Sequence, residues 1–215
     1  MKLVLATSNK DKVREIKEIL DKNIEIYTIE DFDLKNFEVE EDGKTLKENA
    51  YKKAKSLYDI LKIPTLADDT GLFVEALDLK PGVYSHRYAG DNPTYKDNRD
   101  KLLYELKNSK NRKAYFKTSV CFIDEKGKDY YFDGKIDGEI SKKEYGNKDF
   151  GYDQIFEIVE LNKTFGQMSD EEKNLYSHRS LALEKFKKFI LKEDFNEDIS
   201  NKWYPRRNWF DCRLY

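Results

Sequence analysis

Residues 2–20 of the chain read KLVLATSNKDKVREIKEIL. The apolar run Leu3–Ala6 has the composition of a buried strand. Apolar residues then recur at the spacing of one helix face, namely at Val13, Ile16, Ile19 and Leu20. The stretch therefore predicts a strand, a polar loop and a helix, the opening unit of an α/β fold.

Similar units are expected farther along the chain. Thr45 and Glu48 have the spacing of a capping box, so a second helix begins there and stops at Pro64. The apolar residues Thr65–Ala67 predict a short buried strand. Asp68–Gly71, which follow at once, predict a loop at the end of that strand.

The second half of the chain continues with a helix and a hairpin. A helix is expected over Tyr95–Leu106 and a strand over Ala114–Ile123. Glu125–Gly127 predict a turn into a further strand at Asp129–Phe132. The chain therefore combines helices with neighbouring strands.

The last predicted helix marks the end of the domain. Ser169 and Glu172 repeat the capping-box spacing. Apolar residues follow at Leu181, Leu183, Phe186, Phe189 and Ile190. We expect one domain over residues 1–192, and a C-terminal extension of unknown role over residues 193–215, which show no clear period.

Composition limits the class of protein. The chain has 215 residues, of which 39% are hydrophobic, enough to bury a core. Its 40 basic and 42 acidic side chains nearly balance, with a formal net charge of -2. This balance argues against a surface for duplex nucleic acid, whereas a local cluster of cations would still hold a small polyanion.

Cysteine usage and hydropathy exclude other classes. Cys121 and Cys212 form no CxxC pair and the chain has two histidines, so neither a disulfide scaffold nor a structural zinc site is expected. The sequence has neither the pattern of a signal peptide nor that of a membrane span. We therefore expect a cytoplasmic protein without a membrane partner.

The loop between the first strand and the first helix is a candidate anion site. It reads Thr7-Ser8-Asn9-Lys10-Asp11-Lys12 and concentrates hydroxyl, amide and ammonium donors where free N–H groups and the helix dipole favour an anion. An ordinary helix cap followed by solvated lysines explains the same residues equally well. The loop is not a Walker motif, which is absent from the chain.

Two acidic groups are candidates for a metal site. Magnesium takes oxygen ligands, and one or two carboxylates together with phosphate suit it. The group Glu38–Asp42 precedes the second helix, and taken alone is typical of a solvated loop. The pair Asp68 and Asp69 follows a buried strand, where water is scarce and adjacent carboxylates would repel each other. This pair is therefore harder to explain as a solvated loop.

Two later segments combine aromatic, acidic and basic side chains. They are Phe150–Asp153 and the stretch from Lys173 to Arg179, which includes His178. Base stacking and polar recognition need such a mixture. Core aromatics and a helix-surface charge account for either segment alone.

Taken in order, these segments resemble the inosine triphosphate pyrophosphatase family, house-cleaning enzymes that act on xanthosine and inosine triphosphates. The resemblance covers about residues 2–190 and rests on LATSNKDKVREI, TLKENAYKKA, LADDTGL, PGVYSHRYAG, FGYDQIF and MSDEEKNLYSHRSLAL. It implies a mixed α/β fold in which an elongated, twisted sheet and flanking helices form two lobes around a central cleft.

The resemblance also implies roles for single residues. Asp69 corresponds to the catalytic proton acceptor, and Glu40 and Asp69 to the magnesium-associated carboxylates. The substrate-binding positions are Thr7, Ser8, Asn9, Lys10, Asp11, Lys12, Lys53, Thr70, Phe150, Gly151, Tyr152, Asp153, Lys173, His178 and Arg179.

The implied reaction is the magnesium-dependent hydrolysis of deaminated purine nucleoside triphosphates (ITP, dITP and XTP) to the monophosphate and pyrophosphate. Water attacks the α-phosphorus, and Asp69 orients or deprotonates it. Arg179 is expected to donate to the 6-oxo group of the base, which makes ATP a poor substrate. A homodimer is implied by the resemblance alone.

Two alternatives stay open. A related nucleotide pyrophosphatase acting on pyrimidine or modified nucleotides would use a similar fold, and substrate profiling separates it from the first reading. A catalytically inactive nucleotide-binding module would keep the same cleft, and pyrophosphate release from dITP would exclude it.

Overall fold

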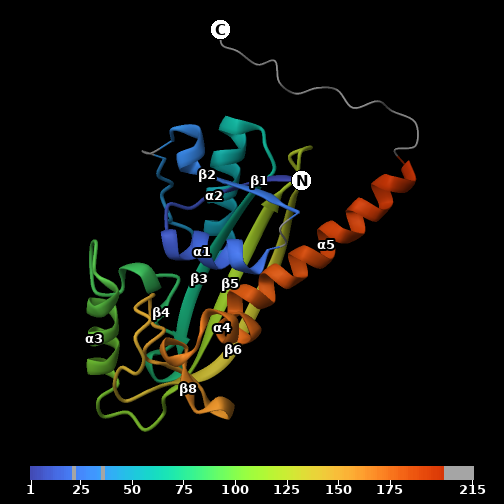
Figure 1. Ribbon diagram of the computed structural model, residues 1–215. Coiled ribbons are helices and arrows are strands. Elements are labelled where there is room, and N and C mark those ends of the chain that lie inside the picture. Colours follow the sequence, from blue (N-terminus) through green and yellow to red (C-terminus); the bar gives the residue numbers. More distant parts are fainter. Residues whose placement is uncertain (21–22, 35–36, 201–215) are drawn as a thin grey trace.

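A mixed β-sheet runs through the whole molecule (Figure 1). The computed structural model describes residues 1–20, 23–34 and 37–200, with residues 193–200 described through their backbone only. The strands in these residues are β1 (Lys2–Leu5), β2 (Glu25–Thr28), β3 (Thr65–Val74), β4 (Pro81–Gly82), β5 (Lys113–Ile123), β6 (Asp129–Ile140), β7 (Phe156–Ile158) and β8 (Lys163–Thr164). They lie in the order β2-β1-β3-β5-β6-β7-β8, and β4 pairs with β3.

Helices cover both faces of this sheet. They are α1 (Lys10–Ile19), α2 (Leu46–Leu61), α3 (Tyr95–Glu105), α4 (Asp170–Tyr176) and α5 (His178–Ser200). In Figure 1, α1, α2, β1 and β2 form an upper lobe, and α3, β4 and β8 lie in a lower lobe. The long strands β3, β5 and β6 connect the two lobes, and α5 crosses them diagonally. The structure confirms the expected mixed α/β fold with two lobes.

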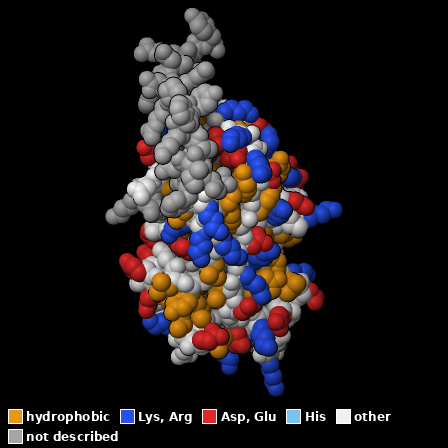
Figure 2. Space-filling view, turned by 90° about the vertical axis from the view of Figure 1, so that its right-hand side faces the viewer, with side chains coloured by type: hydrophobic (Ala, Val, Ile, Leu, Met, Phe, Trp, Pro, Cys, Tyr) orange, Lys and Arg blue, Asp and Glu red, His pale blue; other side chains and the backbone are white. Residues whose placement is uncertain are grey.

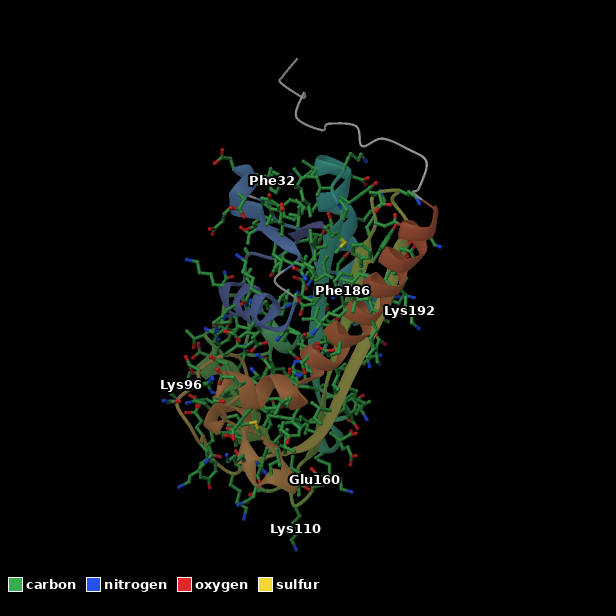
Figure 3. The ribbon with its side chains drawn as sticks, turned by 45° about the vertical axis from the view of Figure 1, so that its right-hand side comes forward. Phe32, Lys96, Lys110, Glu160, Phe186 and Lys192 are labelled. Atoms are coloured by element: carbon green, nitrogen blue, oxygen red, sulfur yellow. The ribbon has the colours of Figure 1, made fainter. Side chains whose placement is uncertain are left out.

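The upper lobe has a hydrophobic core on each face of the sheet. Successive residues of a strand point to opposite faces, so Leu3 and Leu5 face α1 and α5 while Val4 faces α2. From α5, Phe186 packs against the first of these faces, whereas Lys192 is exposed (Figure 3). A third cluster, which includes Leu102 and Phe156, fills the lower lobe.

The register of β1 and β3 creates the opening of the cleft. The two strands are parallel, but they pair only from Val4 opposite Thr65 to Leu5 opposite Leu66. Beyond this point the chain leaves β1 for the polar loop, while β3 continues along β5 to Val74. The part of β3 that follows Leu66 therefore lies beside the polar loop.

The predicted loop at Asp68–Gly71 is wrong, because these residues belong to β3. Asp68 pairs with Val120 and Gly71 with Lys117, so β5 continues the antiparallel ladder along the whole polar stretch. The second strand of the hairpin also extends beyond the predicted Phe132, to Ile140. The short strands β2, β4, β7 and β8 were not predicted.

The first strand, the first three helices and the strand at Ala114–Ile123 form where they were predicted. The single last helix predicted from the Ser169 cap is wrong, because Ser177 has an extended backbone that separates α4 from α5. The helix α2 begins after the Thr45 cap, whose side chain accepts from the N–H of Glu48. The helix α5 continues past residue 192 to Ser200. No break in secondary structure marks the predicted boundary, which stays a prediction, and residues 201–215 of the predicted extension lie outside the described residues.

Acidic and basic side chains are intermingled on the face shown in Figure 2, in keeping with a net charge near zero. Exposed charges also surround the lower lobe, where Figure 3 labels Lys96, Lys110 and Glu160. Within the described residues, every helix is too short or too polar to cross a membrane.

Candidate active site

A cavity of about 570 Å³ lies between the two lobes. Its walls come from the polar loop after β1, the segment before α2, the middle of β3, the start of α3, the loop before β7, and the α4–α5 junction. This volume is within the range of pockets that hold small organic ligands. Segments far apart in the sequence therefore meet at one site.

The polar loop presents the start of α1 to the cavity. Asn9 caps the helix, because its Oδ1 accepts from the N–H groups of Asp11 at 3.0 Å and Lys12 at 3.1 Å. Thr7, Ser8, Asn9 and Lys12 line the cavity. Helix N-termini favour anions, and an ammonium group in the first turn strengthens that preference. This end of the cavity is suited to phosphate.

Two predicted loop residues lie outside the main cavity. Lys10 is exposed and is not among its lining residues. Asp11 lies in an adjoining pocket and forms an ion pair with Arg14 at 3.1 Å. The structure therefore places neither side chain against a ligand in the main cavity.

Asp69 and Glu41 share the ammonium group of Lys53. Lys53 Nζ lies 3.0 Å from Asp69 Oδ1 and 3.2 Å from Glu41 Oε2, and Asn49 Nδ2 donates to Asp69 Oδ2 at 3.1 Å. Burial, together with the nearby charge of Glu41, raises the pKa of the Asp69 carboxyl, although Lys53 and Lys12 oppose the shift. Asp69 is thus a stronger base than an ordinary aspartate.

Glu40, the predicted metal ligand, lies on the outside. Its side chain is exposed and does not line the cavity, whereas those of Phe37, Glu38, Val39 and Glu41 do. The attraction of Lys53 accounts for the position of Glu41, and Arg87 Nη2 also donates to the Glu41 carbonyl oxygen at 2.8 Å. By geometry, Glu41 is the acid next to Asp69.

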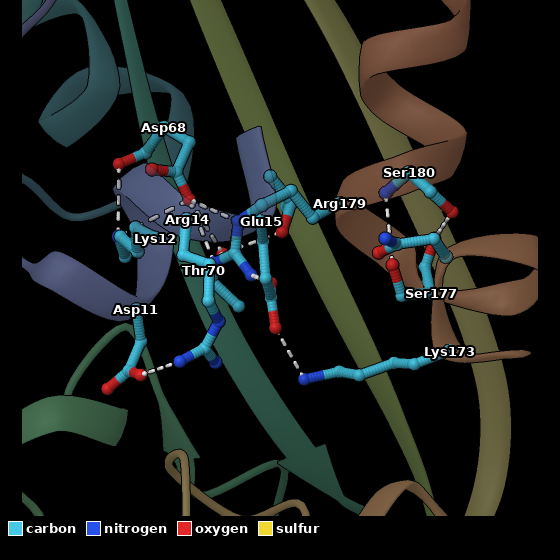
Figure 4. A network of polar contacts seen from close by, with 12 residues as sticks. Asp11, Lys12, Arg14, Glu15, Asp68, Thr70, Lys173, Ser177, Arg179 and Ser180 are labelled. Atoms are coloured by element: carbon cyan, nitrogen blue, oxygen red, sulfur yellow. Dashed lines mark hydrogen bonds and ion pairs between the residues drawn. The ribbon is translucent and has the colours of Figure 1, made fainter. Parts of the chain in front are cut away.

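Asp68 points away from Asp69, as alternate residues of a strand do. It binds Lys12 Nζ at 3.3 Å and Arg179 Nη2 at 3.1 Å, and accepts from the Thr70 hydroxyl at 3.2 Å (Figure 4). Although burial opposes ionisation, the charges of Lys12 and Arg179 hold the pKa of Asp68 well below its usual range. Asp68 therefore anchors cations rather than serving as a base.

Arg179 and Lys173 meet a second buried carboxylate, Glu15 of α1. Lys173 Nζ lies 2.6 Å from Glu15 Oε1 and also binds Asp153, and Arg179 binds the other oxygen of Glu15 (Figure 4). Burial, followed by the negative charge of Glu15, raises the pKa of Asp153 to about 6 against the pull of Lys173. Arg179 lines the cavity with its guanidinium paired to Glu15 and Asp68, and its role as a donor to the base stays a prediction.

The far end of the cavity has an aromatic wall. Phe150 lies with Lys173 Nζ 5.0 Å and Arg179 Cζ 5.6 Å from its ring centre. The adjacent Gly151 has a positive φ of 55°, which favours glycine. Tyr152 is buried, and its hydroxyl donates to the carbonyl oxygen of Ser85 at 2.8 Å. Phe150 therefore offers a face for stacking, and Tyr152 supports the wall.

His178 lies at the first turn of α5 with its ring stacked on Phe116, 4.4 Å between centres. Burial, then the charges of Arg179 and Lys173, lowers the pKa of His178 well below its usual value, so the ring is neutral. Its Nδ1 is buried and has no hydrogen-bond partner among the described residues. The neutral His178 ring therefore lines the cavity with the hydrogen-bonding capacity of its buried Nδ1 unused.

Some residues of the site were not predicted. Glu15 follows Lys12 by three positions and therefore lies on the same face of α1. This spacing was the one local feature of the sequence that placed Glu15 near the site. Tyr95 of α3 reaches across the cleft and accepts from Asn9 Nδ2 at 3.1 Å. Arg87 stands in a motif that was recognised, but nothing in the sequence showed its contact with the segment before α2.

The fold and the cleft define a two-lobed mixed α/β protein whose site is cationic and carboxylate-bearing at one end and aromatic at the other. This class agrees with the sequence comparisons. The chain belongs to the Ham1 family, which it matches over residues 3–189.

Named relatives are similar over nearly their whole length. The dITP/XTP pyrophosphatase of Thermoanaerobacter pseudethanolicus is 44% identical over 195 residues, covering 89% of this chain and 98% of the relative. That of Aquifex aeolicus is 46% identical, with 86% and 94% covered. The solved Ham1 protein of Staphylococcus aureus superposes with a TM-score of 0.81 at 36% identity, covering 90% of this chain and 100% of that one.

Proposed function

We propose that the protein hydrolyses deaminated purine nucleoside triphosphates, such as ITP, dITP and XTP, to the monophosphate and pyrophosphate. The observation that carries this proposal is the meeting, in one cavity, of the cationic α1 start with Asp69 and Glu41 at one end and Phe150 at the other. Relatives at 44–46% identity named dITP/XTP pyrophosphatase support the same substrate class.

In the proposed mechanism, the triphosphate lies along Lys12, Lys53 and the N-terminus of α1. These groups neutralise negative charge as the bond from the α-phosphorus to the pyrophosphate oxygen breaks. Asp69 accepts the proton of the attacking water. Its raised pKa makes it a better proton acceptor, and Asn49 holds its carboxylate in place.

A magnesium ion fits the donors present. Among the described residues no cluster of three or more metal-binding side chains exists, but magnesium commonly uses one or two carboxylates and completes its shell with phosphate and water. Glu41 and Asp69 provide two carboxylates around one cation position, which Lys53 now takes. We propose that these two acids hold magnesium, which supplies charge neutralisation to the triphosphate when bound.

Base recognition would use the aromatic wall and the buried polar network. Phe150 offers its face for stacking, and the neutral His178 offers an unpaired Nδ1. The paired network of Glu15, Lys173 and Arg179 keeps its polar groups fixed, so a base whose edge does not match would leave buried groups unsatisfied.

A homodimer and a cytoplasmic location stay predictions.

A magnesium-dependent screen of pyrophosphate release across ITP, dITP, XTP, GTP, ATP and dUTP tests the proposal. We expect kcat/KM for ITP, dITP and XTP to exceed that for ATP by at least about tenfold, the scale of one unsatisfied buried polar group. A lower kcat/KM for GTP is expected from the resemblance to dITP/XTP pyrophosphatases alone. Preference for dUTP would favour the pyrimidine-directed alternative. Release from none of them would favour the non-catalytic one.

A further inference from the structure

A buried arginine of α3 clamps the loop that carries Phe150. Arg99 is 2% exposed, although it lies in a helix whose other face meets solvent. Its Nη1 donates to the carbonyl oxygens of Asp149 at 3.3 Å and Gly151 at 2.9 Å, the residues directly before and after Phe150. The guanidinium therefore holds the backbone on both sides of the aromatic ring.

Two carboxylates compensate the buried charge of Arg99. Its Nε donates to Glu144 at 2.6 Å, and its Nη2 to Asp149 Oδ1 at 2.5 Å. Both acids belong to the same loop, which connects β6 with β7. Burying a guanidinium costs free energy unless its N–H groups are paired. The four hydrogen bonds of Arg99 provide this pairing, and all four go to the same loop.

The same helix face supports the ring itself. Tyr95 lies one turn before Arg99, and its ring meets the Phe150 ring edge-to-face at 5.6 Å and 72°. Phe150 also lies near Lys173 and Arg179. The orientation of Phe150 therefore depends on α3 as well as on the cations of the cleft.

We propose that Arg99 is a positioning residue that sets Phe150 for stacking on the purine base and so controls substrate affinity without touching the substrate. The inference rests on the proposed function, because it takes Phe150 as the wall against which the base stacks. It predicts that loss of the clamp weakens binding of the nucleotide and leaves the hydrolytic step at Asp69 largely intact.

The fold should survive the loss of Arg99. The side chain of Asp149 is 71% exposed and that of Glu144 30%, so both acids can be hydrated when the guanidinium is removed. Arg112 provides a matched control in the same lobe. It also donates to backbone carbonyl oxygens, those of Ile140, of Leu106 at 3.0 Å and of Ser141 at 2.7 Å, but none of these flanks Phe150.

The test is steady-state pyrophosphate release from dITP by the full chain and its variants Arg99→Gln, Arg99→Lys, Phe150→Leu, Arg112→Gln and the double variant Arg99→Gln with Phe150→Leu. We expect Arg99→Gln to raise KM by about 5- to 30-fold, because a misplaced Phe150 ring would lose part of the contribution of one aromatic stack to base binding. The kcat of this variant should stay within about threefold of the wild-type value. Arg99→Lys, which cannot reach both carbonyls, gives a smaller rise. Arg112→Gln leaves KM unchanged.

The double variant separates positioning from general stability. If Arg99 acts through Phe150, then Arg99→Gln changes KM by less than about twofold once Phe150 is leucine. An unchanged KM in both Arg99 variants, a matching KM rise in Arg112→Gln, or fully multiplicative effects in the double variant would overturn the inference. Wild-type activity on dITP is measured beside them, so its absence would identify a failure of the proposed function itself and of the inference with it.

Discussion

Exchanging Glu41 for glutamine tests which acid before α2 serves the metal-chelated triphosphate. Glu41 Oε2 lies 3.2 Å from Lys53 Nζ, at a cation position shared with Asp69. A magnesium ion brought by the substrate to this position would gain the attraction of Glu41. Glu41→Gln keeps the size of the side chain and removes its charge.

The magnitude follows from this distance. At an effective dielectric constant of about 20, unit charges 3.2 Å apart attract by about 5 kcal/mol. The Glu41 side chain is 38% exposed, so screening reduces the net contribution to about 1–2 kcal/mol. This range corresponds to a change of about 5- to 30-fold in an equilibrium constant.

The assay is the rate of pyrophosphate release from dITP as magnesium is titrated. We expect the magnesium concentration at half-maximal rate to rise by about 5- to 30-fold for Glu41→Gln. Glu40→Gln is the matched control, because Glu40 is exposed and outside the cavity, and its titration should follow the wild type. An equal or larger shift for Glu40→Gln would show that Glu41 is not the acid that binds the magnesium.

Three further predictions concern the proton acceptor Asp69, the pH dependence of its protonation and the packing of α5, which carries His178. Asp69→Asn should lower kcat by about 10²- to 10⁴-fold with a melting temperature close to that of the wild type, since a proton acceptor is lost at constant volume; near-normal turnover would remove Asp69 from the mechanism. Because burial raises the pKa of Asp69 in the free protein, the base is lost as pH falls through that raised value, so kcat/KM for dITP should begin to fall above the usual aspartate value of about 4. A kcat/KM that stays flat down to pH 4 would contradict this. Gly134→Ala should lower the free energy of unfolding in a denaturant titration by about 1–3 kcal/mol or more, because its Cβ would lie 1.9 Å from the His178 carbonyl oxygen; unchanged stability would show that α5 can shift at no cost.

The regular elements were predictable because their patterns are local. The apolar spacing of α1 and the capping box of α2 come from residues a few positions apart, and both helices form where expected. The polar stretch Asp68–Gly71 misled for a physical reason. Its strand conformation is imposed by the ladder with β5, a partner about fifty residues away, which local propensity does not report.

The candidate site was predicted in its parts but not in its geometry. Hydrophobic periodicity does not distinguish Glu40 from Glu41, since their segment lies in neither helix nor strand. Their orientation is decided by Lys53 of α2 and by the distant Arg87. Likewise, the pairing of Arg179 with Glu15 joins residues 164 positions apart, so no local pattern indicates it.

Hydrolysis of dITP in water labelled with oxygen-18, with both products analysed by mass spectrometry, shows which phosphorus the water attacks. Attack of water on the α-phosphorus predicts one labelled oxygen in dIMP and unlabelled pyrophosphate. Label in the pyrophosphate, or formation of dIDP and phosphate, would contradict the proposed placement of the α-phosphorus beside Asp69.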